Sequence, residues 1–236
     1  AVALRPTQAA NSLLDKQRSI LSIAGLGDDS LSGDQVRAMF GDRIKARVVD
    51  LEAGKYSEDY DHDASMKFDH AASAKDPAIS VKLDGKDDIA SIKRRENLAT
   101  VYVVEENGQL ETLIIPVRGY GLWSTLHGFI AVKDDLNTVT GFGFYEHAET
   151  PGLGGEVDNP KWKALWPGKE VFDANGKPVL HVIKGNVDRS SPAAKHQIDG
   201  IAGATLTSNG VNHLLDFWLG ENGFGPFIKR LRKGEA

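Results

Sequence analysis

Hydrophobic residues recur three or four positions apart near the two ends of the chain, whereas they alternate with polar residues in its centre. Over residues 11–24 this spacing predicts an amphipathic helix that ends at Gly25, since glycine is favoured just after a helix. A second helix is expected over residues 32–40, with Ser32 or Asp34 as its N-cap. The chain is therefore predicted to begin with two helices.

Alternating segments predict a β-strand over residues 45–51 and then three successive hairpins. The paired segments are residues 100–105 with 110–117, 129–133 with 139–145, and 171–173 with 178–184. The first pair flanks Asn107-Gly108 and the third flanks Asn175-Gly176, a dipeptide typical of tight hairpins. Successive hairpins form an antiparallel β-sheet, so with helices packed at both chain ends we predict the α+β fold class.

Residues 54–97 are polar and acidic, and we interpret them as an acidic surface excursion. Asp59, Asp61 and Asp63 have a spacing seen in calcium ligands, but the glycine and the closing glutamate of a calcium loop are missing, which favours solvated charge. The predicted division is a helical and strand segment over residues 1–53, the excursion over residues 54–97, and a main unit over residues 98–236. We expect one compact unit overall.

The composition is that of an ordinary globular protein, with 41% hydrophobic and 26% charged residues among 236. The net charge of −5 argues against nucleic acid as a partner. The absence of cysteine excludes disulfides, thiolate metal sites, iron–sulfur clusters and cysteine catalysis. No run approaches the roughly 20 apolar residues that a membrane helix needs, and no signal peptide is recognisable.

The stretch from Asp199 to Gly210 combines small residues with hydroxyl side chains and leads into apolar positions at helical spacing. This pattern is typical of a loop that delivers threonine and serine to the first turn of an amphipathic helix. Backbone N–H groups there lack helical partners and carry the positive end of the helix dipole, which suits a phosphate. An ordinary N-cap formed by Thr205, Thr207 or Ser208 is the structural alternative.

Two further glycine-rich motifs lie between the predicted strands. Residues 118–125 form a glycine-hinged turn that exposes Trp123, and residues 146–155 place a proline-glycine turn and two further glycines after a strand. Together they predict a slot for a planar ring, with apolar faces from Leu122, Trp123 and Leu153 and a few polar groups at its edge. Ordinary loops with a packing tryptophan are the structural alternative.

The sequence does not support several other kinds of site. The seven histidines lack ligand spacing, so no metal is predicted. A serine or threonine hydrolase would need a Gly-x-Ser-x-Gly elbow and a histidine partner, and a nucleotide enzyme would need a Gly-x-Gly-x-x-Gly or Walker motif. None of these is found, and His213 is expected to face solvent from its helix. We therefore predict that the chain has no catalytic residues of its own.

The three glycine-rich motifs, taken in order, resemble the FMN-binding domain family. They read Gly-x-Gly-Leu-Trp-Ser from residue 119, Glu-Thr-Pro-Gly-Leu-Gly from residue 149 and Gly-Ala-Thr-x-Thr-Ser from residue 203. The stretch from Asp199 to Ser208 also resembles that family's flavinylation signature, in which a threonine hydroxyl is esterified to the FMN phosphate by a separate flavin transferase. Ala202 stands where the family usually has serine or threonine, a departure that leaves the acceptor hydroxyl in place.

The resemblance implies covalent FMN on Thr205, with Thr207 as a competing hydroxyl and the choice left open by the sequence. The residues expected to bind the cofactor are Gly203, Ala204, Thr205, Leu206, Thr207, Ser208, Leu122, Trp123, Ser124, Glu149, Thr150, Gly152, Leu153 and Gly154. Glu149 and Thr150 are assigned to contacts with the flavin or its tail, and the N–H groups of residues 206–208 to its phosphate. His147 either bonds the flavin edge or has a structural role.

The resemblance extends over nearly the whole chain. Residues 4–26 and 216–227 are similar to segments of the C subunit of the sodium-translocating NADH:quinone oxidoreductase. This implies an electron-carrying redox subunit, not catalytic alone, in a membrane respiratory complex that transfers electrons from NADH to ubiquinone and exports sodium. The alternatives are the flavin subunit of the related ferredoxin-coupled electron transport complex and a flavin-free interaction domain that shares the fold.

The same resemblance implies the partners of the chain and its location in the cell. The expected partners are the other subunits of the complex and, during maturation, the flavin transferase. A single membrane helix precedes the corresponding position in that family, and the start at Ala1 without methionine suggests a processed or truncated product that lacks it. We expect the bacterial inner membrane as the location, with the soluble domain on the periplasmic side and residues 98–236 as the FMN-binding domain.

Overall fold

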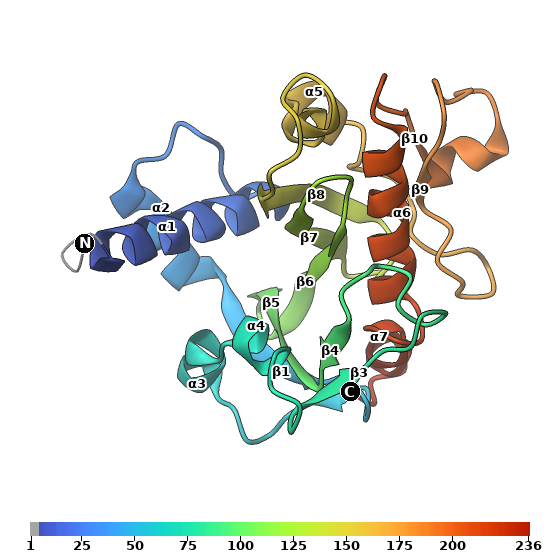
Figure 1. Cartoon of the computed structure of the whole chain (residues 1–236). Coiled ribbons are helices and arrows are strands. Elements are labelled where there is room, and N and C mark those ends of the chain that lie inside the picture. Colours follow the sequence, from blue (N-terminus) through green and yellow to red (C-terminus); the bar gives the residue numbers. More distant parts are fainter. Residues whose placement is uncertain (1–4) are drawn as a thin grey trace.

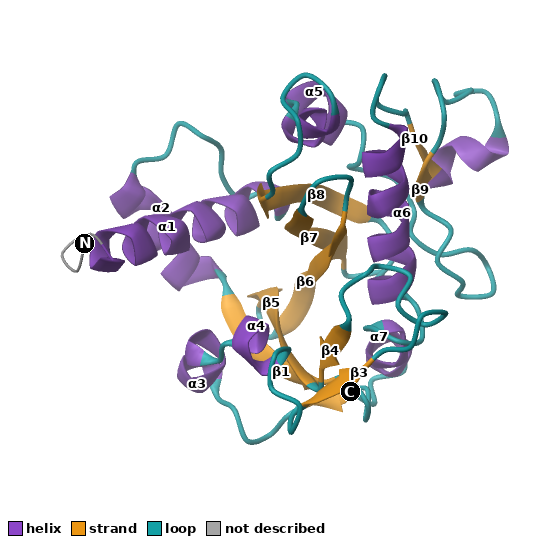
Figure 2. Ribbon diagram, viewed as in Figure 1, coloured by secondary structure: helices purple, strands orange, loops and turns teal. Residues whose placement is uncertain are grey.

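The computed structural model describes residues 5–236 and places one antiparallel sheet between two layers of helices (Figure 1). Residues 1–4, on which the interpretation of a processed chain start rests, lie outside the described residues. Figure 2 shows the strands at the centre and helices on either side. The predicted α+β class, with an antiparallel sheet and helices at both chain ends, is confirmed.

The main sheet has six strands in the order β2-β1-β5-β6-β7-β8, and its neighbouring strands pair antiparallel. The strands are β1 (Lys45–Asp50), β2 (Lys55–Tyr56), β5 (Leu98–Glu106), β6 (Gln109–Tyr120), β7 (Thr125–Lys133) and β8 (Val139–Glu146). Two small sheets pair β3 (Ser80–Lys82) with β4 (Arg94–Glu96) antiparallel and β9 (His181–Val182) with β10 (Gln197–Ile198) parallel.

The helices fall into two layers that enclose the sheet. They are α1 (Arg5–Ile23), α2 (Gly33–Arg43), α3 (His62–Lys67), α4 (His70–Ser73), α5 (Pro160–Lys163), α6 (Thr205–Leu219) and α7 (Gly225–Arg232), with 3-10 turns over Gly154–Asp158 and Pro192–His196. Helices α1 and α2 pack on one face, whereas α5, α6 and α7 pack on the other (Figure 1). The molecule therefore has three layers.

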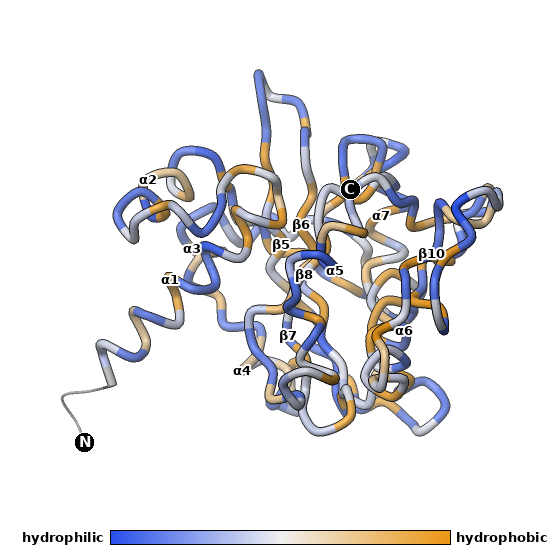
Figure 3. Tube along the Cα trace, turned by 90° about the horizontal axis from the view of Figure 1, so that it is seen from above, coloured by the Kyte–Doolittle hydropathy of each residue, from blue (hydrophilic) through white to orange (hydrophobic). Residues whose placement is uncertain are grey.

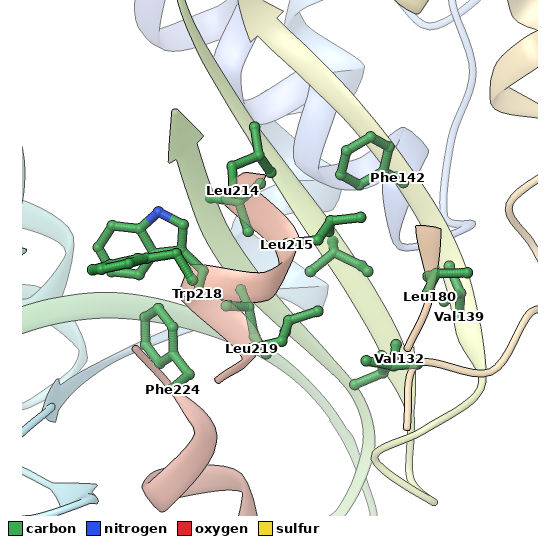
Figure 4. Close-up of a cluster of buried hydrophobic side chains, with 14 of the residues drawn as sticks. Val132, Val139, Phe142, Leu180, Leu214, Leu215, Trp218, Leu219 and Phe224 are labelled. Atoms are coloured by element: carbon green, nitrogen blue, oxygen red, sulfur yellow. The ribbon is translucent and has the colours of Figure 1, made fainter. Parts of the chain in front are cut away.

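The alternation of side chains along β6 produces two separate hydrophobic cores. Leu113 and Ile115 point into the core shared with α6 and α7, whereas Ile114 between them points into the core shared with α1 and α2. Figure 4 shows part of the larger core, where Leu215 and Trp218 of α6 lie among strand residues and Phe224. Burial of the apolar stripe of α6, which the sequence predicts, thus anchors this helix on the sheet.

The two predicted N-terminal helices are confirmed, and both are longer than expected. Helix α1 begins at residue 5 instead of 11, and it ends where Gly25 adopts φ +74° and the Leu26 N–H donates to the Leu21 carbonyl at 2.8 Å. Helix α2 begins after Ser32, whose hydroxyl accepts from the Gln35 N–H while the Gln35 side chain accepts from the Ser32 N–H. Ser32, and not Asp34, is therefore the cap.

Two of the three predicted hairpins are confirmed. Strands β5 and β6 join through Asn107 and Gly108, which adopt φ of 53° and 77°, the left-handed values of a two-residue hairpin turn. Strands β7 and β8 form the second hairpin, with Phe129 paired to Gly143. Each strand is extended beyond the predicted limits by residues at its ends.

The third predicted hairpin, residues 171–173 with 178–184, forms only next to its turn. Phe172 and Pro178 form an isolated antiparallel bridge, flanked by bonds from the Asp173 N–H to the Lys177 carbonyl and from the Val179 N–H to the Val171 carbonyl. The pairing ends there because the Val171 N–H donates to the Asn137 carbonyl and not to residue 179. The Asp173 carboxylate stabilises the turn by accepting from the Asn175 and Lys177 N–H groups. Residues 181–182 then pair parallel with β10 as β9, next to the loop that precedes α6.

The acidic segment over residues 54–97 contains β2, α3, α4, β3 and β4. Two of its aspartates cap short helices, because the Asp61 side chain accepts from the Ala64 N–H and the Asp69 side chain accepts from the Ala72 N–H. The segment also buries Glu96 against the sheet. The predicted division of the chain at residues 53 and 97 stays a prediction.

Figure 3 shows the hydropathy of the chain along its course, with hydrophobic positions along the sheet and α6 and hydrophilic positions in the outlying loops. This is the distribution expected of a protein that folds around its own cores. Within residues 5–236, none of the helices combines the length and the apolar character needed to cross a membrane.

Candidate functional site

The glycine-rich loop and the hydroxyl residues that the sequence singles out meet at the start of α6. Gly203 adopts φ +71°, a left-handed conformation that glycine accepts without strain, and Ala204 is the N-cap. Alanine has no side-chain oxygen, so the N–H groups of Leu206 and Thr207 receive no capping bond from it. None of Thr205, Thr207 and Ser208 holds the cap position, and the first N–H groups of α6 have no partner within the helix.

The two candidate hydroxyls have opposite environments. Thr205 is the first residue of α6 and is exposed. Thr207, in the same turn of the helix, has no exposed surface, and its Oγ1 donates to Glu149 Oε2 at 2.6 Å. The Ser208 N–H donates to the Ala204 carbonyl at 3.0 Å, so this N–H belongs to the helix and is not available to a ligand. Only the first of the two threonines is exposed to solvent.

The carboxylate of Glu149 joins the tryptophan turn to α6. Its Oε1 accepts from the Trp123 N–H, the Ser124 N–H and the Ser124 hydroxyl, each at 3.0 Å, and its Oε2 accepts from the Leu122 N–H at 3.1 Å. Thr207 supplies the fifth donor from the helix side. These bonds satisfy a carboxylate that is 5% exposed, so Glu149 faces the protein interior. Its predicted contact with flavin stays a prediction.

The hydrogen bonds also determine the ionisation of Glu149. Burial acts to raise the pKa of the carboxyl, but the Thr207 hydroxyl and the N–H groups of Trp123 and Leu122 act in the opposite direction and prevail. The pKa therefore lies below its ordinary value, and the group is a carboxylate at neutral pH. A charged acceptor makes each of these bonds stronger than a neutral one would be.

A pH dependence of stability follows from this lowered pKa. Because the folded-state pKa of Glu149 is depressed, its contribution to stability is fully present above the unfolded value of about 4.3 and is lost as the pH falls through the folded value. We expect the stability difference between the wild type and Glu149→Gln to shrink as the pH is lowered from about 6 to about 3. Urea unfolding at several pH values measures it, and a difference that stays constant would contradict the expectation.

The tryptophan turn and α6 approach each other at a glycine. A Cβ on Gly210 would lie 2.5 Å from the Tyr120 carbonyl oxygen and 2.9 Å from the Gly121 Cα. Both are backbone atoms, which cannot move aside as the end of a flexible side chain can. Gly210 therefore sets how closely the turn lies against the helix, and with it the distance between the first and third motifs.

We expect Gly210→Ala to destabilise the protein by about 1–3 kcal/mol, because overpacking outweighs the gain in helix propensity. Gly41→Ala is the matched control, since Gly41 is also inside a helix but a Cβ there would have no atom within 4 Å, and this change should stabilise by about 0.5–1 kcal/mol. Urea denaturation of both variants tests the pair. Equal stabilisation by both substitutions would contradict the close contact.

A cleft of about 360 Å³ lies beside Thr205. Lys184, Asn186 and Gly203 line it together with Ser208. The Ser208 side chain is 6% exposed, and among residues 5–236 its Oγ has no hydrogen-bond partner. An orphaned buried hydroxyl, the uncapped end of a helix and a lysine in one cleft match the chemistry of a phosphate group. The residues present therefore fit the phosphate of FMN.

The loop that forms the far wall of this cleft is one that the sequence analysis did not recognise. Asn212 of α6 holds it by donating to the Val182 carbonyl at 2.9 Å and accepting from the Val182 N–H at 2.7 Å. Asp199 holds it from the other side, by accepting from the Val187 N–H and from Arg189. Two signals in the sequence could have indicated this loop. One is Asn212, which is flanked by apolar positions on its helix, and the other is Lys184-Gly-Asn, which is typical of a turn.

Large apolar side chains are exposed around the start of α6. Trp123 is 66% exposed, Leu206 58% and Leu153 45%. Leu153 lies over the loop before the helix, because a Cβ on Gly203 would be 3.0 Å from its Cδ2. One residue comes from each of the three motifs, and each leaves surface that a flat ring would cover.

His147 has partners within the protein. Its Nδ1 accepts from the Glu149 N–H at 3.1 Å, and its Nε2 lies 2.6 Å from Asp158 Oδ2. The two bonds specify the tautomer with hydrogen on Nε2. Of the two roles considered for His147, this geometry is that of the structural one. Among the residues from 5 to 236, His, Asp and Glu side chains form no group of three or more suited to a metal ion.

The structure brings the predicted site residues together in two environments. Exposed or partly exposed are Gly203, Thr205, Leu206, Leu122, Trp123, Ser124, Thr150, Gly152 and Leu153. Buried are Ala204, Thr207, Ser208, Glu149 and Gly154. The exposed set forms the surface of the site and the buried set supports it. The role of each residue toward a cofactor stays a prediction.

Comparison with known proteins identifies the class to which this fold and site belong. The family model of the FMN-binding domain matches residues 121–220, a range that begins in the tryptophan turn and ends after α6. Residues 121–220 are therefore an FMN-binding domain, which includes the three motifs from Gly121 onward and the cleft. The residues at the start of α6 fit the phosphate of that cofactor.

The particular protein family follows from full-length relatives. The chain is 63% identical over 236 residues to the C subunit of the Na(+)-translocating NADH-quinone reductase of Pseudomonas aeruginosa, covering 100% of this chain and 89% of that protein. The same subunit of Yersinia pestis is 43% identical and covers 99% of this chain and 86% of that protein. The chain belongs to the family of the C subunit of the Na(+)-translocating NADH-quinone reductase. The prediction of this family from the sequence is confirmed.

Solved structures agree with this assignment. The crystal structure of Shewanella oneidensis NqrC superposes with a TM-score of 0.84 at 35% identity and covers 96% of this chain and 99% of that one. The C subunit from Parabacteroides distasonis gives a TM-score of 0.69 at 27% identity and covers 97% of this chain and 96% of that one. As a member of this family the chain is one subunit of a membrane complex, and other subunits are its partners.

Proposed function

We propose that this chain is an electron carrier that holds FMN covalently through a phosphoester on the hydroxyl of Thr205. The observation that carries the proposal is the contrast between the two threonines of the motif. Thr205 is exposed at the uncapped start of α6 and lines a cleft, whereas Thr207 is buried and donates its hydrogen to Glu149. A transferase reaches an exposed hydroxyl without unfolding the helix.

The attachment replaces the hydroxyl hydrogen of Thr205 by a flavin phosphoryl group. The threonine oxygen attacks phosphorus in a flavin donor that contains a phosphoanhydride bond, and the bond from phosphorus to the leaving phosphate breaks. The hydroxyl proton goes to a base of the transferase. The phosphodiester that results keeps one negative charge, which we assign to the N–H groups of Leu206 and Thr207 and to the Ser208 hydroxyl. Lys184 in the same cleft adds a positive charge.

The apolar surface around the first turn of α6 binds the ring. Trp123, Leu153 and Leu206 each expose a large side chain there, so a planar aromatic group would cover apolar area on contact with them. The bound FMN supplies the redox chemistry, and the chain binds, orients and shields it. This role requires no proton transfer by a side chain, in accordance with the buried and satisfied state of Glu149.

The redox partners are the other subunits of the complex. The family's name supports transfer of electrons from NADH to a quinone with translocation of sodium, in which this chain carries electrons and does not oxidise NADH by itself. We place the domain on the periplasmic side of the bacterial inner membrane, with ubiquinone as the quinone and the flavin transferase as a partner during maturation. The exposure of Thr205 supports the flavin transferase as a partner, because the enzyme must reach this residue.

Production of the chain with and without the flavin transferase tests the proposal. With the transferase, the intact mass should increase by one flavin phosphoryl group, the solution should be yellow, and a peptide digest should place the group on Thr205. Without the transferase, the chain should have its unmodified mass. An unmodified chain in the presence of a transferase that is active on a known substrate would favour a flavin-free interaction domain instead.

The exposed tryptophan offers a separate test of where the ring lies. We expect Trp123→Ala to shift the flavin midpoint potential by up to about 30 mV, because an aromatic contact contributes about 0.5–1.5 kcal/mol and 30 mV corresponds to about 1.4 kcal/mol for two electrons. Flavin fluorescence should rise as well, since the quenching ring is removed. A potentiometric titration measures the shift, and an unchanged midpoint and spectrum would remove Trp123 from the site.

A further inference from the structure

Glu149 is a buried charged group whose partners come from two segments that lie far apart in the sequence. On one side are the N–H groups of Leu122, Trp123 and Ser124, and on the other is the Thr207 hydroxyl at 2.6 Å. Removing a carboxylate from water is costly unless hydrogen bonds replace the lost solvent, as they do here. The carboxylate is thus a link between the tryptophan turn and α6.

Two glycines provide the space for this carboxylate. A Cβ on Gly121 would lie 2.8 Å from Glu149 Oε1, and a Cβ on Gly154 would lie 2.9 Å from Oε2 and 2.4 Å from Thr207 Oγ1. Neither glycine has a positive φ, so space and not backbone conformation explains the absence of a side chain at these two positions. All three motifs of the site therefore meet at the carboxylate.

We infer that Glu149 is a positioning residue of the flavin site, which holds the Trp123 turn on the first turn of α6 and so fixes the apolar surface relative to the attachment hydroxyl. The inference rests on the proposed attachment of FMN to Thr205. This role does not involve a direct contact between Glu149 and the flavin, because both carboxylate oxygens are bonded to the protein. Glu149 acts on the cofactor through the residues it holds.

Amide hydrogen exchange of the wild-type protein without flavin is the first test. Trp123 is 66% exposed and Leu122 and Ser124 are half-buried, and the hydrogen-bond partner of all three N–H groups is the Glu149 carboxylate. If the carboxylate holds them, the N–H groups of Leu122, Trp123 and Ser124 should exchange at least about tenfold more slowly than in an unstructured peptide. Exchange at the unstructured rate would overturn the inference without any variant.

The Glu149→Gln variant is the second test, with Glu146→Gln as its matched control. Glu146 lies three residues earlier in the same segment and is exposed, so the control makes the same chemical change away from the turn. Glutamine cannot accept from all of these donors, because one carboxylate oxygen becomes an NH₂ group. We expect exchange at residues 122–124 to become at least about tenfold faster in Glu149→Gln and to remain unchanged in Glu146→Gln. Equal rates in the two variants would overturn the inference.

Tryptophan fluorescence of the protein without flavin tests whether Glu149 restricts the mobility of the Trp123 turn. All four tryptophans lie within the described residues, and Trp162, Trp166 and Trp218 are at most 6% exposed, so quenching by acrylamide reports mainly on Trp123. The anisotropy of the fluorescence that acrylamide quenches should fall in Glu149→Gln and not in Glu146→Gln. An anisotropy equal to that of the wild type in both variants would count against the inference.

The flavin-loaded protein separates this inference from the proposed function. If the wild type made with the transferase carries no flavin on Thr205, the proposed attachment is wrong and the inferred link to the cofactor is overturned with it, although the exchange data still report whether Glu149 holds the turn. If the wild type is loaded, Glu149→Gln should shift the flavin midpoint potential and the visible circular dichroism, and Glu146→Gln should not. A loaded Glu149→Gln protein with wild-type exchange, potential and dichroism would overturn the inference and leave the attachment intact.

Discussion

A Thr205→Val variant produced together with the flavin transferase is expected to contain no covalently bound flavin. Valine keeps the branched shape of threonine but has no hydroxyl oxygen to attack phosphorus. The other threonine of the motif does not replace it, because Thr207 has no exposed surface and its Oγ1 is bonded to Glu149. Intact-mass measurement should therefore give the unmodified mass, a complete loss of the covalent product.

The fold of this variant should be unaffected. Thr205 is exposed at the first position of α6, and surface substitutions of this kind usually change stability by less than about 0.5 kcal/mol. Urea unfolding checks this point. Thr207→Val is the control, since it removes the buried hydroxyl but leaves the exposed one, and it should still become loaded. Flavin found covalently bound in Thr205→Val would identify another residue as the acceptor.

An Arg118→Met variant is expected to lose about 3–5 kcal/mol of stability, the largest effect of any substitution considered for this protein. Arg118 binds Glu96 through both terminal nitrogens, each at 2.7 Å, and Glu96 is 1% exposed. Methionine fills a similar volume but leaves the buried carboxylate without its counter-charge. Thermal or urea unfolding of the protein without flavin measures the loss.

Arg37→Met provides the comparison for this prediction. Arg37 also forms an ion pair, at 3.0 Å from Asp34, but its side chain is 55% exposed and that of Asp34 is 99% exposed. Exposed pairs contribute about 0–1 kcal/mol, so this variant should be nearly as stable as the wild type. Similar losses in both variants would show that burial of Glu96 is not the cause.

Arg118 also matters for the site, because it lies near the end of β6, where the sheet contacts α6. The guanidinium lies 4.9 Å from the Trp218 ring, and the Trp218 indole N–H donates to the Arg118 carbonyl at 2.8 Å. A Cβ on the next residue, Gly119, would be 2.8 Å from the Leu214 Cβ. Disturbing this contact should move the helix that presents the acceptor, so Arg118→Met should also slow flavin attachment.

Local signals allowed much of the fold to be predicted from the sequence. The Asn107-Gly108 hairpin depends on two residues that tolerate left-handed backbone, and the end of α1 depends on Gly25, so a short stretch contains the necessary information. The apolar stripe of α6 is likewise contained in one short stretch of sequence. The hairpin around Asn175-Gly176 had the same signal, but its pairing ends after one bridge because the Val171 N–H donates to the distant Asn137 carbonyl.

The parts of the site that could not be predicted depend on contacts between distant residues. Glu149 and Thr207 are 58 positions apart, and nothing in either motif specifies that one accepts the hydrogen of the other. The choice between the two threonines needed this contact, because their local sequences are equally compatible with attachment. The wall of the cleft depends likewise on Asn212 binding Val182 across 30 positions. Motifs located the site, whereas tertiary packing defined the accessibility of each hydroxyl.

The sheet separates the hydrophobic interior into two cores, and the sequence of each core can change independently of the other. The core under α1 and α2, with Ile20 and Phe40, shares no side chain with the one under α6, which contains Leu214 and Trp218. Substitutions in the two cores should combine additively in their effects, because residues without shared contacts act independently. The outer surface above α1 can thus change to suit a new neighbour while the packing of α6 on the other face stays constant.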